Sequence, residues 1–334
     1  MFTGKKFFKL TIYVFILVFL SSYAYAAKSV YVINDTQTSN LKAYKIEGFS
    51  LIYQTDYTCF WDPEGLIGAI GVKIDESRYG KFLFVTFEES DVIELINAMT
   101  MQFVDSIVAP GATDLAGVEM DSINSKLYAV DRYTNNLYSW TWNPETMNLT
   151  PDFDEPFYVG LQDCLDAFGI ALDEENGLLY VADNTDSIKY YNTNDWSKEG
   201  EISVYCYVIS IAIDVPNQLL YYGSMGAYGE GDNHLYKYNL STHTESSVNV
   251  GTSVAGIAVD QQTSLVYITT FGGQDDIYYP NLPQDRLMIY NSNLVKQSFE
   301  SGDIGNPAGL TVAEDVAYKL EGFSIVKEKI QVLS

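Results

Sequence analysis

Short runs in which hydrophobic and polar residues alternate occur along most of this chain, and polar turns separate them. Val72 and Ile74, like Ile170 and Leu172, are spaced two residues apart, which is the period of a strand with two different faces. Segments such as DEENG and DVPNQ follow these runs and are typical of tight turns. No helical pattern of comparable length competes with them, so the chain is predicted to be all-β.

One phrase recurs along the chain: a small residue, an alternating strand that ends in Asp, a polar turn, and a second strand with a central aromatic residue. It begins at Gly71, Gly117, Gly169, Ser210 and Gly256. Further strand-like sequence follows each pair of strands, for example at 136–142 and 234–239. A four-stranded sheet of about 40 to 50 residues that repeats radially is a propeller blade.

The two ends of the chain supply complementary halves of a sixth unit. Residues 309–313 match the first strand of the phrase without a second, and residues 29–34 match the second strand without a first. Joining them ties down both chain ends and removes the open edge of an incomplete ring. The sequence therefore predicts a six-bladed β-propeller of four-stranded antiparallel blades over residues 27–316, closed by pairing of the N- and C-terminal strands. Residues 317–334 are predicted to be a tail, a linker stub or part of an extra blade, which leaves a seven-bladed ring as the alternative.

The repeat resembles a known group of propellers. GIALDEENGLLYVAD, from Gly169 to Asp183, is similar to an NHL repeat, and SVYVIN at 29–34 is similar to the related YVTN repeats. The resemblance extends over nearly all of residues 27–316 and implies a six-bladed propeller of the TolB-like or gluconolactonase-like type. Propellers of this kind serve as lactonases, lyases, sugar or peptide binders and surface scaffolds, so the resemblance implies no single function.

Residues 1–26 are predicted to be a secretion signal. Three lysines between residues 5 and 9 precede an apolar run over 10–20 and the small-residue site Ala24-Tyr25-Ala26. An uncleaved membrane anchor is the alternative, but the run is shorter than the roughly 20 residues that span a bilayer. The protein is therefore expected to be exported to the periplasm, the exterior or the cell surface, without membrane insertion after cleavage.

The charge and the cysteines change this picture in two ways. A formal net charge of −25 repels phosphate backbones and anionic lipid surfaces, so nucleic acid is not an expected partner. The acidity fits solubility outside the cell or in high salt, and it also fits cation binding. The three cysteines are too few for a disulfide framework, although one bridge between Cys164 and Cys206 remains open, since both precede the first strands of neighbouring blades.

Residues rich in side-chain oxygens recur where the loops of a propeller meet the central channel. They stand three residues before the start of a first strand or at the exit of a second strand. A hard cation such as calcium, or another divalent ion, takes six to eight oxygen ligands of this kind. The alternative is that these side chains cap tight turns. The residues are Asp114, Asp166, Asn306, Asp131, Asp183 and Asn34. The arrangement resembles that of the gluconolactonase and senescence marker propellers, which carry a divalent metal at the channel mouth.

Two further sets of charged residues have architectural explanations. An aspartate ends the first strand of five units, and its recurrence predicts a turn cap rather than a catalytic group. Lys73 and Glu119 occupy equivalent inward positions on neighbouring blades and are predicted to pair inside the channel. The repeated aspartates are Asp75, Asp121, Asp173, Asp214 and Asp260.

Two long insertions, residues 224–234 and 270–286, leave second strands on adjacent blades. Long loops on a rigid scaffold are common recognition elements, and tyrosines beside carboxylates suit sugars or peptides. The candidate ligand-binding residues are Tyr228, Asp232, Asp275, Asp276, Tyr278 and Tyr279. No nucleophile elbow, zinc-protease helix or nucleotide-binding loop appears. The leading hypothesis is a non-enzymatic scaffold for an extracellular carbohydrate or protein, and the alternative is a metal-dependent hydrolase or lyase of lactonase type.

Overall fold

The computed structural model describes residues 28–34, 41–47, 50–58, 69–77, 79–155, 157–183, 185–204, 206–224, 232–271, 285–301, 304, 307–313, 318–321 and 324–327. Every regular element in these residues is a β-strand. None of them forms a helix long and apolar enough to cross a membrane. The predicted signal, residues 1–26, lies outside this description.

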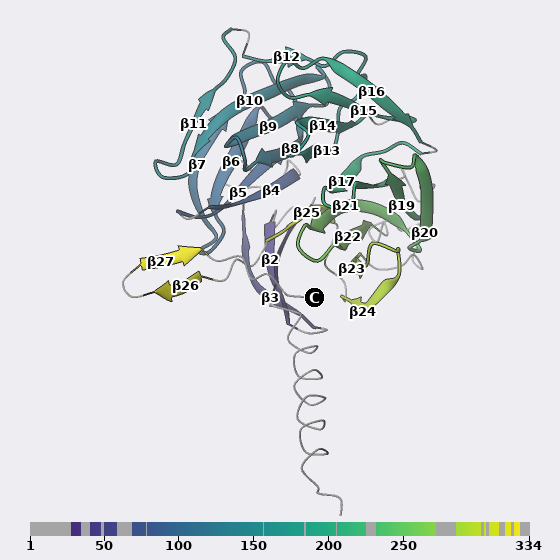
Figure 1. Cartoon of the computed structure of the whole chain (residues 1–334). Coiled ribbons are helices and arrows are strands. Elements are labelled where there is room, and N and C mark those ends of the chain that lie inside the picture. Colours follow the sequence, from purple (N-terminus) through teal and green to yellow (C-terminus); the bar gives the residue numbers. More distant parts are fainter. Residues whose placement is uncertain are drawn as a thin grey trace, which may run out of the picture.

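The strands form six antiparallel sheets arranged as propeller blades (Figure 1). From the innermost strand outward, blade 1 contains β25 (Pro307–Val312), β1 (Lys28–Asn34), β2 (Leu41–Glu47) and β3 (Ser50–Tyr57). Blade 2 contains β4 (Ala69–Ser77), β5 (Gly80–Phe87), β6 (Val92–Asn97) and β7 (Gln102–Val108). Blade 3 contains β8 (Leu115–Asp121), β9 (Lys126–Asp131), β10 (Asn136–Asn143) and β11 (Asn148–Pro151), and the short strand β12 (Val159–Gly160) also pairs with β10.

The remaining blades follow the same order. Blade 4 contains β13 (Ile170–Asp173), β14 (Leu178–Ala182), β15 (Ser187–Asn192) and β16 (Lys198–Ser203). Blade 5 contains β17 (Ser210–Asp214), β18 (Leu219–Gly223), β19 (His234–Asn239) and β20 (Thr244–Asn249). Blade 6 contains β21 (Ser253–Asp260), β22 (Leu265–Phe271), β23 (Arg286–Tyr290) and β24 (Lys296–Glu300).

The ring closes in blade 1, where the last strand of the propeller pairs with the first. β25 runs antiparallel to β1, with Tyr31 opposite Thr311 and Val32 opposite Leu310. The predicted six-bladed fold and its closure are thereby confirmed. β26 (Tyr318–Glu321) and β27 (Ser324–Lys327) form a separate two-stranded sheet, so the described strands make no seventh four-stranded blade.

Hydrophobic contact between adjacent blades holds the ring together. Six clusters of buried residues occur, one at each interface between neighbouring blades. At the interface of blades 2 and 3, for example, Phe84 packs edge-on against Trp142 with ring centroids 5.2 Å apart. Full burial of such a side chain stabilises the fold by roughly 1.5 to 3 kcal/mol. Because blades 1 and 6 share a cluster as the others do, closure continues the apolar packing around the whole ring.

Four of the five repeated aspartates are seen to cap the turns of their own blades, as predicted. Asp121, Asp173 and Asp214 each accept the backbone N–H of the asparagine three residues later, with N···O distances of 2.8, 3.1 and 3.3 Å. Asp260 accepts a backbone N–H within its own turn at 3.0 Å, and Asp75 accepts an indole N–H from the next blade at 2.9 Å. Their recurrence therefore reflects turn chemistry.

The small residue that begins the repeated phrase lies where the inner strands of neighbouring blades touch. A Cβ atom built on Gly169 would lie 2.5 Å from the carbonyl oxygen of Ile209, and one on Gly117 would lie 2.5 Å from that of Phe168. Carbon and oxygen atoms do not approach so closely without repulsion. Glycine is thus needed at these positions for space, because only a residue without a side chain lets the inner strands approach this closely around the axis.

Candidate functional site

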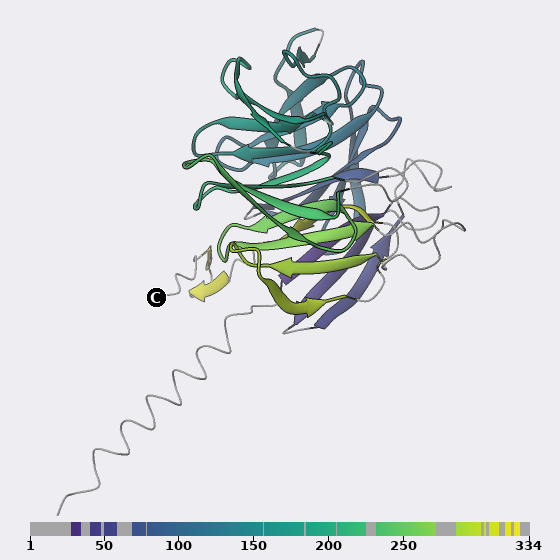
Figure 2. The ribbon, with the colours of Figure 1, turned by 90° about the vertical axis from the view of Figure 1, so that its right-hand side faces the viewer.

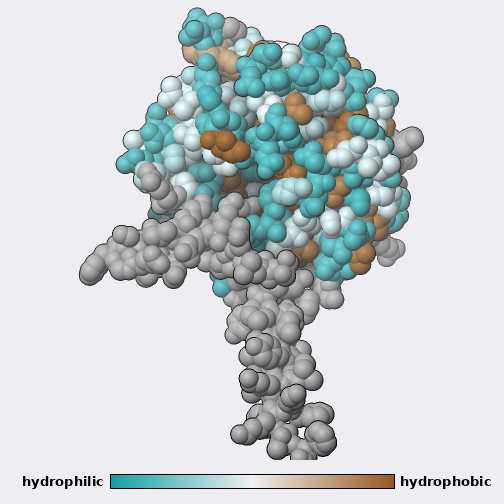
Figure 3. All heavy atoms as spheres, in the orientation of Figure 1, coloured by the Kyte–Doolittle hydropathy of each residue, from teal (hydrophilic) through white to brown (hydrophobic). Residues whose placement is uncertain are grey.

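The two ends of the central channel carry different kinds of loop. The loops that lead into inner strands and those that leave second strands lie at one end, which we call the mouth face. The first turns of the blades lie at the other end, the turn face, and the hairpin of β26 and β27 lies beside it (Figure 2). Figure 3 shows the turn face, which is hydrophilic over most of its area with small separate hydrophobic patches.

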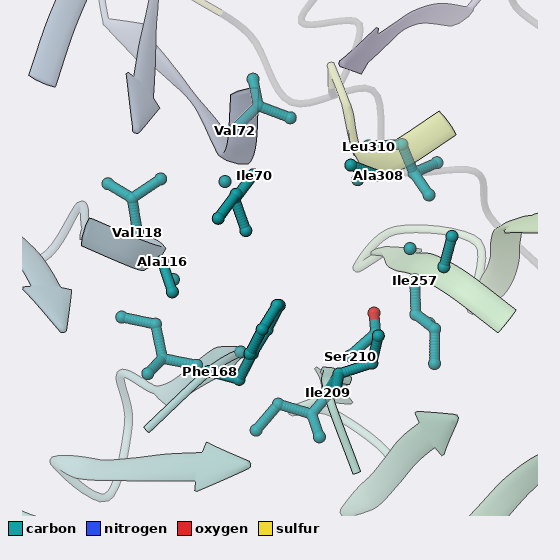
Figure 4. A pocket seen from close by; sticks show the side chains of 18 residues that line it. Ile70, Val72, Ala116, Val118, Phe168, Ile209, Ser210, Ile257, Ala308 and Leu310 are labelled. Atoms are coloured by element: carbon teal, nitrogen blue, oxygen red, sulfur yellow. The ribbon is translucent and has the colours of Figure 1, made fainter. Parts of the chain in front are cut away.

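The waist of the channel is narrow, and most of the side chains that line it are apolar. Equivalent stretches of the six inner strands line a cavity of about 80 Å³, and Val118, Phe168 and Ile257 are among the side chains that line it (Figure 4). Ser210 brings a hydroxyl group to this lining. Sites for drug-sized ligands occupy about 300 to 1,000 Å³. The waist is too small for such a ligand, so recognition of larger partners falls to the two faces.

The predicted oxygen-rich residues form pairs within a blade at the mouth face. In blade 3, Asp131 Oδ2 accepts the backbone N–H of Asp114 at 2.8 Å. In blade 4, Asp183 Oδ1 accepts the backbone N–H of Asp166 at 2.9 Å, and Lys189 forms an ion pair with the other oxygen of Asp183. The aspartate at each strand exit therefore binds the loop that enters the same blade.

Hydrogen bonds fix the charge of Asp131. Burial by itself raises the pKa of this carboxyl group, but backbone N–H groups of Thr113, Thr134 and Asp114 outweigh burial and hold the pKa below its ordinary value. The carboxylate oxygens point into their own loop. In the part of the chain that the structure describes, no group of three or more His, Cys, Asp or Glu is placed to hold a metal ion. The side chains of Asn34 and Asn306 lie outside that part, and a calcium or other divalent site stays a prediction.

Arg132, directly after Asp131, is the centre of a charged cluster at the mouth. Its Nη2 lies 2.6 Å from Asp114 Oδ2 and 3.0 Å from Glu88 Oε1 of blade 2. Its Cζ lies 4.9 Å from the ring centroid of Tyr133 and 5.4 Å from that of Phe168, which precedes blade 4. The guanidinium group thus joins three blades, through two carboxylates and two cation–π contacts.

Replacing Arg132 by methionine is expected to lower the free energy of unfolding by about 3 kcal/mol at neutral pH, because Asp114 would be left buried and charged. Burial already raises the pKa of Asp114, and loss of Arg132 raises it further. When the pKa of a carboxyl group is higher in the folded state than in the unfolded state, the folded state binds the proton more tightly. The free energy of unfolding therefore falls as the pH rises above the ordinary pKa of the carboxyl group. The loss should therefore be larger at about pH 8 than at about pH 5, as urea unfolding would measure.

The matched control is Arg132→Met combined with Asp114→Asn, which removes the charge that needs Arg132. This double variant should recover part of the loss at the higher pH and show a weaker pH dependence. Equal losses for Arg132→Met at both pH values would contradict the ion pair between Arg132 and Asp114.

Three exposed hydrophobic side chains form the mouth patch: Tyr133, Leu165 and Tyr207. Their exposed fractions are 65%, 73% and 69%. Tyr133 and Phe168 contact the same guanidinium group, Leu165 lies in the loop that contains Phe168, and Tyr207 lies two residues before Ile209. Phe168 and Ile209 line the same cavity (Figure 4). The patch therefore extends over blades 3, 4 and 5 beside the channel.

One of the predicted ligand-binding residues lies in the described residues. Asp232 Oδ1 is 2.5 Å from His234 Nδ1, and Tyr236 donates its hydroxyl hydrogen to Asp232 Oδ2. Tyr236 stacks on Tyr222 with ring centroids 4.9 Å apart. Burial, followed by this hydrogen bond, raises the pKa of Tyr236. The carboxylate of Asp232 is thus hydrogen-bonded to residues of its own blade, blade 5. The other candidates, Tyr228, Asp275, Asp276, Tyr278 and Tyr279, lie outside the described residues.

The structure tests two further points from the sequence: a disulfide between Cys164 and Cys206, and an ion pair between Lys73 and Glu119. Cys164 and Cys206 are free thiols, so the disulfide that the sequence left open does not form. The thiol of Cys164 instead donates to Asp183 Oδ1 at 3.3 Å, and burial raises its pKa to about 11. The predicted ion pair between Lys73 and Glu119 is present.

Sequence reasoning did not identify Arg132 or the mouth patch as a site. The available signal was positional: Arg132 and Tyr133 follow the exit of a second strand, and Leu165 and Tyr207 lie in loops that enter first strands. A cation and large hydrophobic residues at such positions depart from the turn-forming residues expected there. The sequence pattern predicted cation ligands at these positions, and that hypothesis included only the aspartates and asparagines.

No protein-family model matches this chain, and no curated protein matches it in sequence. Among solved structures, it is similar to a chain in a crystal structure of a nidogen/laminin complex, with a TM-score of 0.63 and 10% identity over 86% of this chain and 99% of that one. It is also similar to a chain in a crystal structure of the mitotic checkpoint complex, with a TM-score of 0.54 and 13% identity over 85% of this chain and 79% of that one. At these identities the likeness establishes a shared β-propeller fold and nothing further.

Proposed function

We propose that this chain is an exported propeller of the NHL or YVTN kind that binds a protein partner across its mouth face. The observation that carries the proposal is the mouth patch, in which Tyr133, Leu165 and Tyr207 expose large hydrophobic side chains in the mouth-face loops of three consecutive blades. Large aromatic and aliphatic groups that project from a rigid scaffold are common anchors of protein interfaces. Export rests on residues 1–26, and membership of the repeat group rests on the sequence phrase.

The chemistry of the mouth supports binding over catalysis. Asp131 and Asp183 accept hydrogen bonds from their own loops, and the charge of Asp114 is balanced by Arg132. These groups therefore hold the loops in place, while the exposed groups beside them offer apolar contact. Both similar structures named above are of protein complexes, which agrees with a protein partner. Carbohydrate binding by the loops at 224–234 and 270–286 belongs to the same proposal, and those loops lie largely outside the described residues.

The proposal predicts that Leu165→Ser combined with Tyr207→Ser removes partner binding while the fold remains. Substituting anchor residues of an interface weakens binding by about 2 kcal/mol or more each, so the pair should lower affinity at least a hundredfold. Tagged full-length protein would be cross-linked to the exported proteins of its source cells, and the captured protein identified by mass spectrometry. Its affinity for each variant would then be measured with purified components.

A matched control exists on the opposite face of the ring. Met99 and Ile123 lie in turns of blades 2 and 3 at the turn face, with exposed fractions of 76% and 63%. Met99→Ser combined with Ile123→Ser changes a similar amount of exposed apolar surface away from the mouth, and it should leave the affinity unchanged. A partner that binds both double variants and the wild type equally would rule out the mouth patch as its binding surface.

A further inference from the structure

We infer that the segment which the mouth patch binds carries lysine or arginine side chains interspersed with apolar ones. This inference rests on the proposed function, since it specifies the chemistry of the protein partner. Two independent features of the mouth support it: the apolar patch itself and the negative charge of the loops around it.

The charge around the patch is negative after internal ion pairs are counted. Arg132 faces two carboxylates, those of Glu88 and Asp114, so this cluster has an excess negative charge. Lys189 is buried and pairs with Asp183. Glu89 and Asp186, in the loops that leave the second strands of blades 2 and 4, are exposed at the same face. A cationic segment is therefore attracted to this face, and an anionic one is repelled.

The apolar groups fit the same segment. Lysine and arginine have aliphatic stems that pack on hydrophobic surface while the charged head reaches water. The rings of Tyr133 and Tyr207 are both exposed, and a cation above an aromatic face gains about 0.5 to 1 kcal/mol at an exposed site. Leu165 lies between these rings in chain order and supplies an aliphatic contact. A segment that contains both cationic and apolar side chains can therefore contact the mouth patch and the negatively charged loops at the same time.

Two other occupants fit less well. An anionic surface such as nucleic acid or an acidic membrane would face the carboxylates of Glu89 and Asp186. A wholly apolar segment would use the patch but gain nothing from the surrounding charge. The combination of patch and charge therefore favours a cationic, amphipathic protein segment.

The test uses three fluorescein-labelled peptides of equal length and the full chain. One alternates Lys and Leu, the second has Glu in place of Lys, and the third has Ser in place of Leu. Fluorescence anisotropy should show that the Lys/Leu peptide binds at least tenfold more tightly than either counterpart. Raising NaCl from about 0.1 M to about 1 M shortens the Debye length from about 10 Å to about 3 Å and should weaken that binding several-fold.

Variants separate the two contributions. Leu165→Ser with Tyr207→Ser should reduce binding of the Lys/Leu peptide at least tenfold. Glu89→Gln with Asp186→Asn should reduce it several-fold and also flatten its salt dependence. The control is Asp105→Asn with Glu175→Gln, which removes two exposed carboxylates from β7 and from the first turn of blade 4; binding and salt dependence should then stay as in the wild type.

Two results would overturn the inference. Binding of the Glu/Leu peptide as tight as that of the Lys/Leu peptide would remove the role of charge, and binding unaffected by the patch variant would remove the role of the mouth patch. The proposed function is tested separately by the captured partner. If that partner depends on Leu165 and Tyr207 but binds independently of salt and of Glu89 and Asp186, the proposed function stands and the inference about charge fails.

Discussion

Replacing Gly169 by alanine is expected to lower the free energy of unfolding by about 3 kcal/mol, the upper end of the usual cost of overpacking a core. The added Cβ would lie 2.5 Å from the carbonyl oxygen of Ile209, and 3.4 Å from the backbone nitrogen of Ile211. All these neighbours belong to the backbone of blade 5, so no side chain can rotate away. The inner strands of blades 4 and 5 must separate, which loosens contacts on both sides of the junction. Urea unfolding followed by tryptophan fluorescence measures the loss.

The chain provides a matched control for this substitution. Gly160 also lacks a positive φ angle, but among the described atoms a Cβ built there meets only Asn136 Oδ1, at 3.9 Å. Gly160→Ala should therefore change the unfolding free energy by less than about 1 kcal/mol. Gly117→Ala, whose Cβ would lie 2.5 Å from the backbone oxygen of Phe168, should resemble Gly169→Ala. Equal unfolding midpoints for the Gly160 and Gly169 variants would mean that the inner strands are not held in this close contact.

The parts of the fold that sequence predicted are those which a repeat specifies locally. Alternation around Val72 and Ile74 indicates strands, and an aspartate at the end of the first strand marks a turn that it caps itself in four of the repeats. The pairing of Tyr31 with Thr311 could be predicted because each chain end contains one of the two strands of the repeat and lacks the other. The pairing of Lys73 with Glu119 followed because equivalent positions of adjacent repeats must lie side by side. These inferences need only the period and the closure of the ring.

The parts that sequence did not predict depend on contacts between loops of different blades. Arg132 bridges Glu88 of blade 2 and Asp114 of blade 3, and no spacing within one repeat indicates that contact. Asp131 and Asp183 lie at the mouth as expected, yet the direction of each side chain depends on which backbone N–H groups the neighbouring loop presents. The extra strand β12 lies in a stretch between blades 3 and 4 that departs from the repeat. Irregular sequence of this kind has no template from the other blades.

A chain that ends at residue 306 is expected to lose the closed ring, whereas one that ends at residue 316 is expected to unfold cooperatively near the temperature of the full chain. The shorter chain lacks β25, so it loses the buried side chains of Leu310 and Val312 and exposes Val30 and Val32 of β1. At roughly 1.5 to 3 kcal/mol for each side chain, the loss is comparable with the entire stability of about 5 to 15 kcal/mol of a typical domain. The longer chain keeps β25 and, among the strands that the structure describes, lacks β26 and β27, which pair with each other.

Restoring the missing strand from outside distinguishes loss of ring closure from a general effect of truncation. A synthetic peptide of residues 305–316 should bind the chain that ends at residue 306, because the open edge of β1 presents the backbone groups that Thr311 and its neighbours occupy in the ring. Near-UV circular dichroism and the melting temperature should then return toward the values of the full chain. A peptide in which Thr311 is proline should fail, since Ala313 donates its N–H to Ser29 at 2.9 Å and alternation makes residue 311 another donor to β1. If the chain ending at residue 306 melts like the full chain without any peptide, β25 does not close the ring, and the narrow waist that depends on closure loses its basis.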